Sequence, residues 1–126
     1  MDTNKEILFK ELSYRIVGLA MDVHNELGYG FLEKVYENAL LILLNEKGIN
    51  AKQQKSVAVY FHGKEVGKYT TDIVVEDKII LELKSTESIA DAHRAQALNY
   101  LKATGMRLAI IINFGKKRLE YERLVL

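Results

Sequence analysis

The chain of 126 residues contains no cysteine and no proline. Without cysteine, neither a disulfide nor a thiolate metal site can form. No apolar run approaches the roughly 18 residues that a membrane-spanning helix needs, and the N-terminal stretch lacks the basic-then-apolar pattern of a signal peptide. Linkers, repeats and low-complexity stretches are absent as well. We therefore expect a single domain over residues 1–126, cytoplasmic and without membrane contact.

A net charge of +1 conceals an uneven distribution along the chain. Residues 1–48 hold 5 basic and 8 acidic side chains, whereas residues 94–126 hold 7 basic and 2 acidic ones. A basic third beside acidic segments suits a polyanionic ligand that is attracted and then met by a metal ion. A solvated basic face is the simpler interpretation, and charge alone favours it.

Apolar periodicity predicts eight secondary-structure elements. Apolar residues at three-to-four spacing predict a helix over 5–27 with Gly28 beyond its end, and a second helix from Gly30 to about Lys47. Alternating β-branched and aromatic residues predict strands at 52–61, 66–75 and 79–84. A third helix is expected from Ser88 to near Gly105, followed by strands at 107–114 and 119–125. The order ααβββαββ predicts an α/β fold, with a mixed sheet and helices packed on it.

The strands at 66–75 and 79–84 carry charged residues in unexpected places. Asp72, Glu82 and Lys84 lie among aliphatic and β-branched neighbours, where a buried strand pair is expected. Charged groups retained in a strand core usually serve an ion, a substrate or a catalytic step. These three residues are therefore the first candidates for a functional site.

The turn between these two strands decides whether the charged residues meet. A two-residue loop would place Asp72 opposite Leu81, on the wrong face of the sheet. A three-residue loop at 76–78 pairs Val75 with Ile79 and Asp72 with Glu82, so that Asp72, Glu82 and Lys84 converge on one face. The apolar residues then form the opposite face, and both patterns require the same register.

Two opposed carboxylates need a compensating charge. Their Cβ atoms would lie about 5 Å apart, and at an effective dielectric near 20 the repulsion is roughly 3–4 kcal/mol. Lys84 relieves part of it, and a hard cation such as Mg²⁺ would relieve more. We predict a metal site here; a structural salt-bridge cluster on the sheet face is the alternative.

Further candidates lie on the helices. Gln96 and Tyr100 are four residues apart on one helix face, with His93 one turn earlier; a solvated glutamine and a surface tyrosine are the structural alternative. Gly30 is expected to be the N-cap of the second helix, and Glu33 either an acid favoured by the helix dipole or a ligand of a metal or water. His24, near a helix C-terminus, suits a structural or phosphate-contacting role better than metal ligation.

Together these residues resemble the PD-(D/E)XK nuclease superfamily. The string Gly30-x-x-Glu33-x-x-Tyr36, with "DIVVEDKIILELKS" and "INFG", resembles its small GxxExxY branch, and Gln96-x-x-x-Tyr100 resembles a motif of RecB-like exonucleases. The resemblance covers most of the chain, from Val23 to Arg123. It implies a restriction-endonuclease-like core and metal-assisted hydrolysis of phosphodiester bonds.

The resemblance also implies a role for each candidate. Asp72, Glu82 and the main-chain carbonyl of Leu83 would hold one or two Mg²⁺ or Mn²⁺ ions, with Glu33 as a further metal or water ligand, and Lys84 would position the attacking water. Gln96 and Tyr100 would complete the catalytic set. Nucleic-acid contacts are expected from His24, His93, Arg94, Lys116, Lys117 and Arg118.

Other functions fit the same residues. The expected substrate is nucleic acid, with DNA favoured, but the fold could also serve a non-catalytic nucleic-acid-binding module or a protein-interaction domain of a defence or repair complex. The final strand offers an edge through which two copies could pair as a homodimer.

Overall fold

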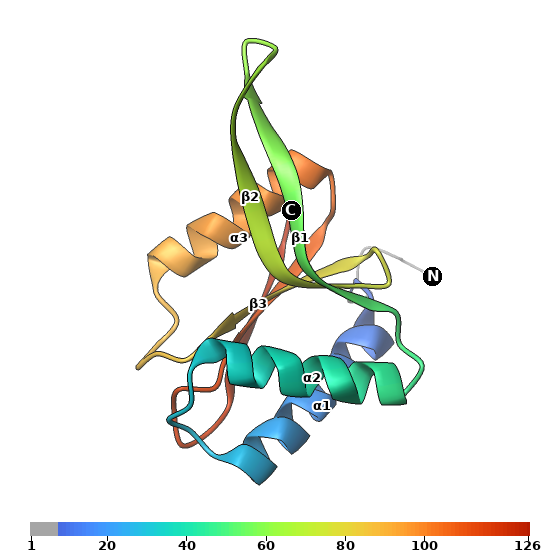
Figure 1. Ribbon diagram of the computed structural model, residues 1–126, viewed down its shortest axis with the longest axis vertical. Helices are drawn as coiled ribbons and strands as arrows, with labels where there is room; N and C mark the ends of the chain where they lie inside the picture. The colour runs from blue at the N-terminus through green and yellow to red at the C-terminus, as the bar shows by residue number, and fades with distance from the viewer. Residues whose placement is uncertain (1–7) are drawn as a thin grey trace, which may run out of the picture.

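The computed structural model describes residues 8–126, which form one five-stranded mixed sheet and three helices (Figure 1). In chain order the elements are α1 (Lys10–Leu27), α2 (Glu33–Glu46), β1 (Ala51–Phe61), β2 (Lys64–Val75), β3 (Ile79–Lys84), α3 (Asp91–Thr104), β4 (Leu108–Asn113) and β5 (Glu120–Val125). The strands lie in the order β1-β2-β3-β4-β5. β3 and β4 pair in parallel, because α3 carries the chain back between them, and the other neighbouring strands within residues 8–126 are antiparallel.

Helices cover both faces of the sheet. Alternate residues of β3, such as Ile79 and Leu81, pack into a core with α1 and α2, whereas Ile80 packs into a second core with Ala97 and Leu101 of α3. Burial on both faces explains why β3 and β4 are almost continuously apolar. The side chain of Glu82 in β3 therefore lies in the interior of the protein.

The predicted element order and mixed α/β fold are confirmed, but the three helix starts differ. The first helix was predicted from residue 5, whereas α1 begins at Lys10, after a turn at residues 8–9. The N-cap of α2 is Leu32 and not Gly30, and α3 begins at Asp91 and not at Ser88. Gly30 has a φ of 111° and belongs to the connecting loop. The main-chain N–H of Ala90 donates to Nδ1 of His93 over 3.0 Å, so a histidine within the first turn of α3 supplies the acceptor. Residues 5–7 of the first predicted helix lie outside the described residues.

The predicted register of the β2–β3 hairpin is confirmed. Val75 pairs with Ile79 and Ile73 with Leu81, across the three-residue connection 76–78. Glu76 and Asp77 both adopt positive φ (54° and 53°), and the N–H of Lys78 donates to the carbonyl of Val75 over 2.9 Å. Lys78 is thus the extra residue that places Ile73 and Val75 on the α1–α2 face.

The β1–β2 hairpin continues beyond the rest of the sheet. The β2–β3 ladder ends at Ile73, but β1 and β2 remain paired as far as Phe61 and Lys64. Figure 1 shows this two-stranded ribbon extending upward, away from the layers of the domain. A two-residue turn at His62 and Gly63, both at positive φ (51° and 76°), closes its tip.

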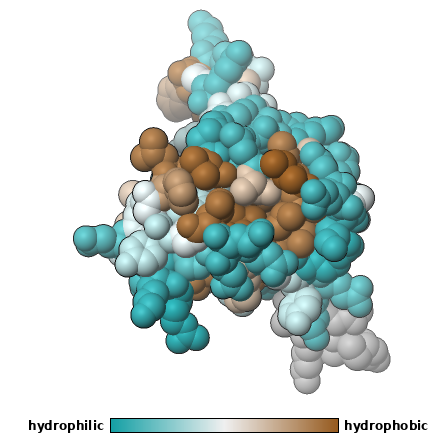
Figure 2. Space-filling model, turned by 60° about the horizontal axis from the view of Figure 1, so that its bottom comes forward, coloured by the Kyte–Doolittle hydropathy of each residue, from teal (hydrophilic) through white to brown (hydrophobic). Residues whose placement is uncertain are grey.

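Apolar side chains are also exposed outside the core. Figure 2, in which the lower side of Figure 1 comes forward, shows a hydrophobic area bordered by polar side chains. Exposed apolar residues of α1, α2 and the loop between them are Tyr14, Met21, Leu27, Tyr29, Phe31, Leu32, Val35 and Ile42. Over residues 8–126, no helix is both long and apolar enough for a membrane span.

Candidate active site

The candidate site is centred where β2 separates from β3. Immediately after the last ladder pair, the N–H of Leu83 donates to Oδ2 of Asp72 over 2.6 Å. The carboxylate therefore replaces the main-chain acceptor that a continuing strand would have provided. This contact holds Asp72 beside the Glu82-Leu83-Lys84 segment, as the sequence predicted.

β1 is irregular at the same level of the sheet. Gln54 has a φ of 52°, and the β1–β2 pairs skip from Gln53–Ile73 to Lys55–Thr71, so Gln54 and Asp72 are both left out of the ladder. A non-glycine residue at positive φ is strained, and such strain concentrates at functional sites. The hairpin thus changes direction at the level of Asp72.

Glu82 lies on the α3 side of the sheet and is only 9% exposed. The hydroxyl of Thr71 donates to its Oε1 over 2.6 Å. Burial raises the pKa of Glu82 to about 7; the Thr71 hydrogen bond and Lys84 oppose the rise, while Asp72 and Glu33 add to it. Near neutral pH this carboxyl group is therefore poised between its charged and neutral forms.

Burial also raises the pKa of Asp72 above its usual value. The Leu83 N–H and Lys84 partly offset this effect, whereas the carboxylates of Glu37 and Glu33 reinforce it. Lys84 is half-buried, and within residues 8–126 it forms no ion pair. The structure therefore brings Asp72, Glu82 and Lys84 together with an excess of negative charge.

The first turn of α2 reaches the same region. The N–H of Ser85, just after β3, donates to Oε2 of Glu33 over 3.3 Å, and the Ser85 hydroxyl donates to the carbonyl of Phe31 over 2.8 Å. Glu33 is exposed and borders a cavity of about 650 Å³, which Lys34, Ser85 and Thr86 also line. The helix acid therefore lies at the end of β3, beside open space.

Glu37 is an acid that the sequence analysis missed. It is only 3% exposed and accepts hydrogen bonds from the side chains of Lys34 (3.2 Å), Gln53 (2.7 Å) and Gln54 (3.1 Å). Its spacing of four residues from Glu33 places both acids on one helix face, which was the available signal. Through Gln53 and Gln54, Glu37 holds the strained part of β1 against α2.

Gln96 and Tyr100 of α3 line the same small cavity as Glu82. Tyr69 and Thr70 also line this cavity, whose volume is about 60 Å³. The Tyr100 hydroxyl donates to the carbonyl of Lys55 over 3.1 Å, and burial, followed by the charge of Glu82, raises the pKa of Tyr100. Tyr100 thus connects the site to the base of the β1–β2 hairpin.

The predicted nucleic-acid contacts lie in different environments. His24 is buried, and its Nε2 lies 2.7 Å from the carbonyl oxygen of Lys116. Arg94 binds Glu122 and Asp91 through contacts of 2.6–2.8 Å, and His93 caps α3. Lys116, Lys117 and Arg118 are exposed in the β4–β5 loop. These three are the most exposed of the predicted contacts, and Lys116 pairs with Glu120 over 3.4 Å. Their role in nucleic-acid binding remains a prediction.

A close contact ties the β4–β5 loop to the site. A Cβ atom at Gly115 would lie 2.3 Å from the main-chain N and O of Thr86, so no side chain fits there without moving the backbone. Asn113 adds hydrogen bonds of 3.0 Å to both main-chain groups of Thr86. The basic loop is therefore held against the segment that follows Lys84.

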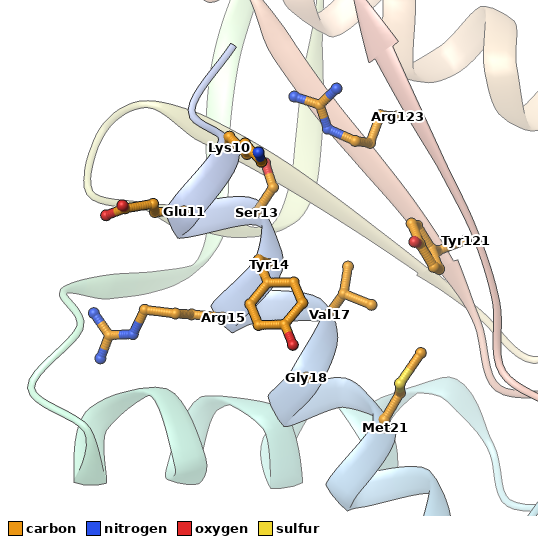
Figure 3. A pocket seen from close by; sticks show the side chains of 10 residues that line it. All are labelled: Lys10, Glu11, Ser13, Tyr14, Arg15, Val17, Gly18, Met21, Tyr121 and Arg123. Carbon is orange, nitrogen blue, oxygen red and sulfur yellow. The ribbon is translucent and has the colours of Figure 1, made fainter. Parts of the chain in front are cut away.

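Another cavity lies away from these acids, between α1 and β5 (Figure 3). Its volume is about 680 Å³, and Tyr14, Val17, Met21 and Tyr121 form much of its wall. Glu11 is the only acid among its lining residues, so it offers no pair of carboxylates. Within residues 8–126, no three His, Cys, Asp or Glu side chains are grouped as metal ligands.

Comparison with known proteins places the chain in a family. A family model of the PD-(D/E)XK nuclease superfamily matches residues 10–124, and the chain belongs to this superfamily. No curated protein matches it.

Solved structures share the fold. The crystal structure of SSO0001 gives a TM-score of 0.61 at 17% identity, over 73% of this chain and 50% of that one, so this chain spans about half the length of SSO0001. An alkaline exonuclease (LHK-Exo) from Laribacter hongkongensis gives a TM-score of 0.54 at 12% identity, over 88% of this chain and 69% of the exonuclease.

Proposed function

We propose that the protein is a metal-dependent nuclease that hydrolyses phosphodiester bonds of nucleic acid, with DNA the favoured substrate. One observation carries this proposal: Asp72 and Glu82 converge beside Lys84 at the point where β2 and β3 separate. Membership of the PD-(D/E)XK nuclease superfamily supports the assignment of these residues to hydrolysis.

The residues present fit a divalent cation. Asp72 uses Oδ2 and Glu82 uses Oε1 in the hydrogen bonds described above, which leaves the other oxygen of each carboxylate to ligate an ion. Carboxylate and carbonyl oxygens are the donors that Mg²⁺ and Mn²⁺ prefer. Asp72, Glu82 and the Leu83 carbonyl would hold one or two such ions, with Glu33 as a further ligand to a metal or water.

A bound cation would act as a Lewis acid on the phosphate and lower the pKa of a coordinated water. Lys84 extends from the same strand segment as Glu82, and its ammonium group would orient the attacking water and offset charge in the transition state. Gln96 would position water or phosphate from the α3 side. Glu82 must lose its proton before it can ligate, so we expect cleavage to increase as the pH rises through about 7.

We further propose that the chain belongs to the GxxExxY branch of the superfamily. Two residues of this motif shape the α1–α2 loop: Gly30 takes a φ of 111°, and the Tyr36 hydroxyl donates to the Gly28 carbonyl over 2.6 Å. The third, Glu33, accepts a hydrogen bond from the N–H of Ser85, just after β3. The Tyr36 ring stacks on Phe114, with centroids 4.5 Å apart. The motif would thus place the helix acid at the end of β3.

A panel of labelled substrates tests the proposed activity. Single strand, duplex, flap, four-way junction and RNA would each be incubated with Mg²⁺, with Mn²⁺ and with EDTA. We expect cleavage of at least one substrate, and its loss in EDTA. Metal-independent binding without cleavage would instead indicate a nucleic-acid-binding module, and neither binding nor cleavage would favour a protein-interaction domain.

A further inference from the structure

The β1–β2 hairpin projects from the domain as a ribbon with an unusual surface. We call residues 55–70 the arm, because they lie beyond the point where Gln54 and Asp72 leave the ladder. Tyr60 and Phe61 near its tip are each 64% exposed. The Phe61 ring stacks on His62, with centroids 4.1 Å apart and planes within 14°. Two adjacent exposed rings at the tip of a projecting ribbon offer a surface on which bases can stack.

The arm carries a net positive charge: its three lysines outnumber its one acid, although Lys55 pairs with Asp77 over 3.5 Å. Lys64 and Lys68 lie on the arm, and Lys102 lies on the facing part of α3. None of these three lysines takes part in an ion pair within residues 8–126. Glu65 is the one acid of the arm. Lysines beside exposed rings are the combination that binds a phosphate backbone and its bases.

A cleft runs between the arm and α3 towards the candidate active site. It has a volume of about 630 Å³ and is lined by Tyr60, Lys68, Tyr69, Asn99 and Lys102, among others. Tyr69 also lines the small cavity that contains Glu82, Gln96 and Tyr100. Tyr69 is therefore a common wall of the two hollows, and the cleft adjoins the small cavity that Glu82 lines.

The base of the arm is fixed to the domain. Val57 and Tyr69 pack against the α3 core, and the Tyr100 hydroxyl donates to the Lys55 carbonyl over 3.1 Å. Two-stranded ribbons are marginally stable alone, so this attachment sets the direction of the arm. The aromatic tip is thereby held at a defined distance from Glu82.

We propose that the arm binds the single-stranded part of the nucleic-acid substrate. The Tyr60 and Phe61 rings stack on unpaired bases, while Lys64, Lys68 and Lys102 contact the phosphates that lead to the active site. Only unpaired bases offer their faces to such rings, because the bases of a duplex are stacked on one another. This inference rests on the proposed function and adds the structural class of the substrate.

Substitution of both rings tests the arm. We expect Tyr60→Ala with Phe61→Ala to weaken binding of a short fluorescent oligodeoxythymidine by roughly tenfold or more, because each stacked base contributes substantially. Tyr14→Ala, which removes an 82% exposed ring from α1, is the matched control and leaves binding unchanged. Anisotropy titrations in Ca²⁺ measure the affinities, and thermal melting checks folding. Equal affinity of the double variant and the wild type would overturn the proposal.

Two further measurements test the proposal. One distinguishes the contribution of base stacking from that of charge, and the other distinguishes single-strand binding from duplex binding. Lys64→Gln with Lys68→Gln should lower the slope of log affinity against log salt concentration by the equivalent of about two phosphate contacts. The ring variant should leave this slope unchanged. Blunt duplex should bind the ring variant and the wild type equally. Weakened duplex binding with unaffected single-strand binding would overturn the single-strand assignment and indicate insertion into a duplex.

A small phosphodiester substrate distinguishes binding by the arm from hydrolysis at the active site. Bis(p-nitrophenyl) phosphate is too short to reach the arm, so the ring variant should hydrolyse it like the wild type while its KM for the oligonucleotide rises. If the wild type cleaves both substrates and the variant matches it on both, the arm proposal fails and the nuclease proposal stands. If the wild type cleaves neither, the nuclease proposal fails, and the binding titration still decides on the arm.

Discussion

Replacement of Lys84 by methionine is expected to lower the rate of Mg²⁺-dependent cleavage by about 10²- to 10⁴-fold, the range that a positioned catalytic group contributes. Methionine keeps most of the length of the side chain and removes the ammonium group. The positive charge of Lys84 partly offsets the rise in the pKa of both Asp72 and Glu82, so it lies close enough to act on the candidate site. Single-turnover cleavage of the best substrate from the panel measures the effect.

The chain contains its own control for this substitution. Glu76-Asp77-Lys78 repeats the spacing of Glu82-Leu83-Lys84, but it lies in the β2–β3 turn, and Lys78 is exposed. Lys78→Met removes the same charge at the other end of the hairpin and should leave the rate unchanged. A Lys84→Met variant as active as Lys78→Met would eliminate Lys84 from the mechanism.

Replacement of Glu82 by glutamine is expected to stabilise the metal-free protein above neutral pH. The folded-state pKa of about 7 lies above the ordinary value of 4.5, so the folded chain retains a proton that the unfolded chain loses. The stability contributed by this group is complete below pH 4.5 and is lost as the pH rises through about 7. Above that, ionisation of buried Glu82 costs on the order of 3 kcal/mol.

Glutamine has nearly the same shape and can still accept the Thr71 hydrogen bond. Chemical unfolding of the wild type and of Glu82→Gln in EDTA should therefore give curves that separate progressively from acidic pH to about pH 8. The variant should be the more stable protein at the upper end, and the two should converge in acid. A difference in the free energy of unfolding that is the same at every pH would show that the pKa of Glu82 is not raised in the folded protein.

Local alternation was enough to predict that Asp72 lies beside Glu82. The apolar pattern required a three-residue connection between Val75 and Ile79, and that register brings Asp72 towards Glu82. Alternation works here because a shift of one residue would turn every side chain of the strand to the other face. Gln96 and Tyr100 followed from helical spacing, and the cavity that they share with Glu82 agrees with it.

Features that depend on distant contacts could not be predicted in this way. Helix starts were misplaced because the loop before α2 is held by Tyr36 and the first turn of α3 by His93, and neither contact has the pattern of a serine or aspartate cap. Departure of β2 from β3 at Asp72 is set by tertiary packing. In the sequence, Glu37 looks like an ordinary acid on a helix surface, because its hydrogen bonds come from Gln53 and Gln54 on a distant strand.

The central claim is that Asp72 and Glu82 form a metal site, and calorimetric titration with Mn²⁺ tests it most directly. At about pH 8, where Glu82 is ionised, the wild type should bind one or two ions, and Glu82→Gln should bind far more weakly. Glu76→Gln, at the hairpin turn, should bind like the wild type. Equal Mn²⁺ binding by the wild type and Glu82→Gln, or none by either, would contradict the account.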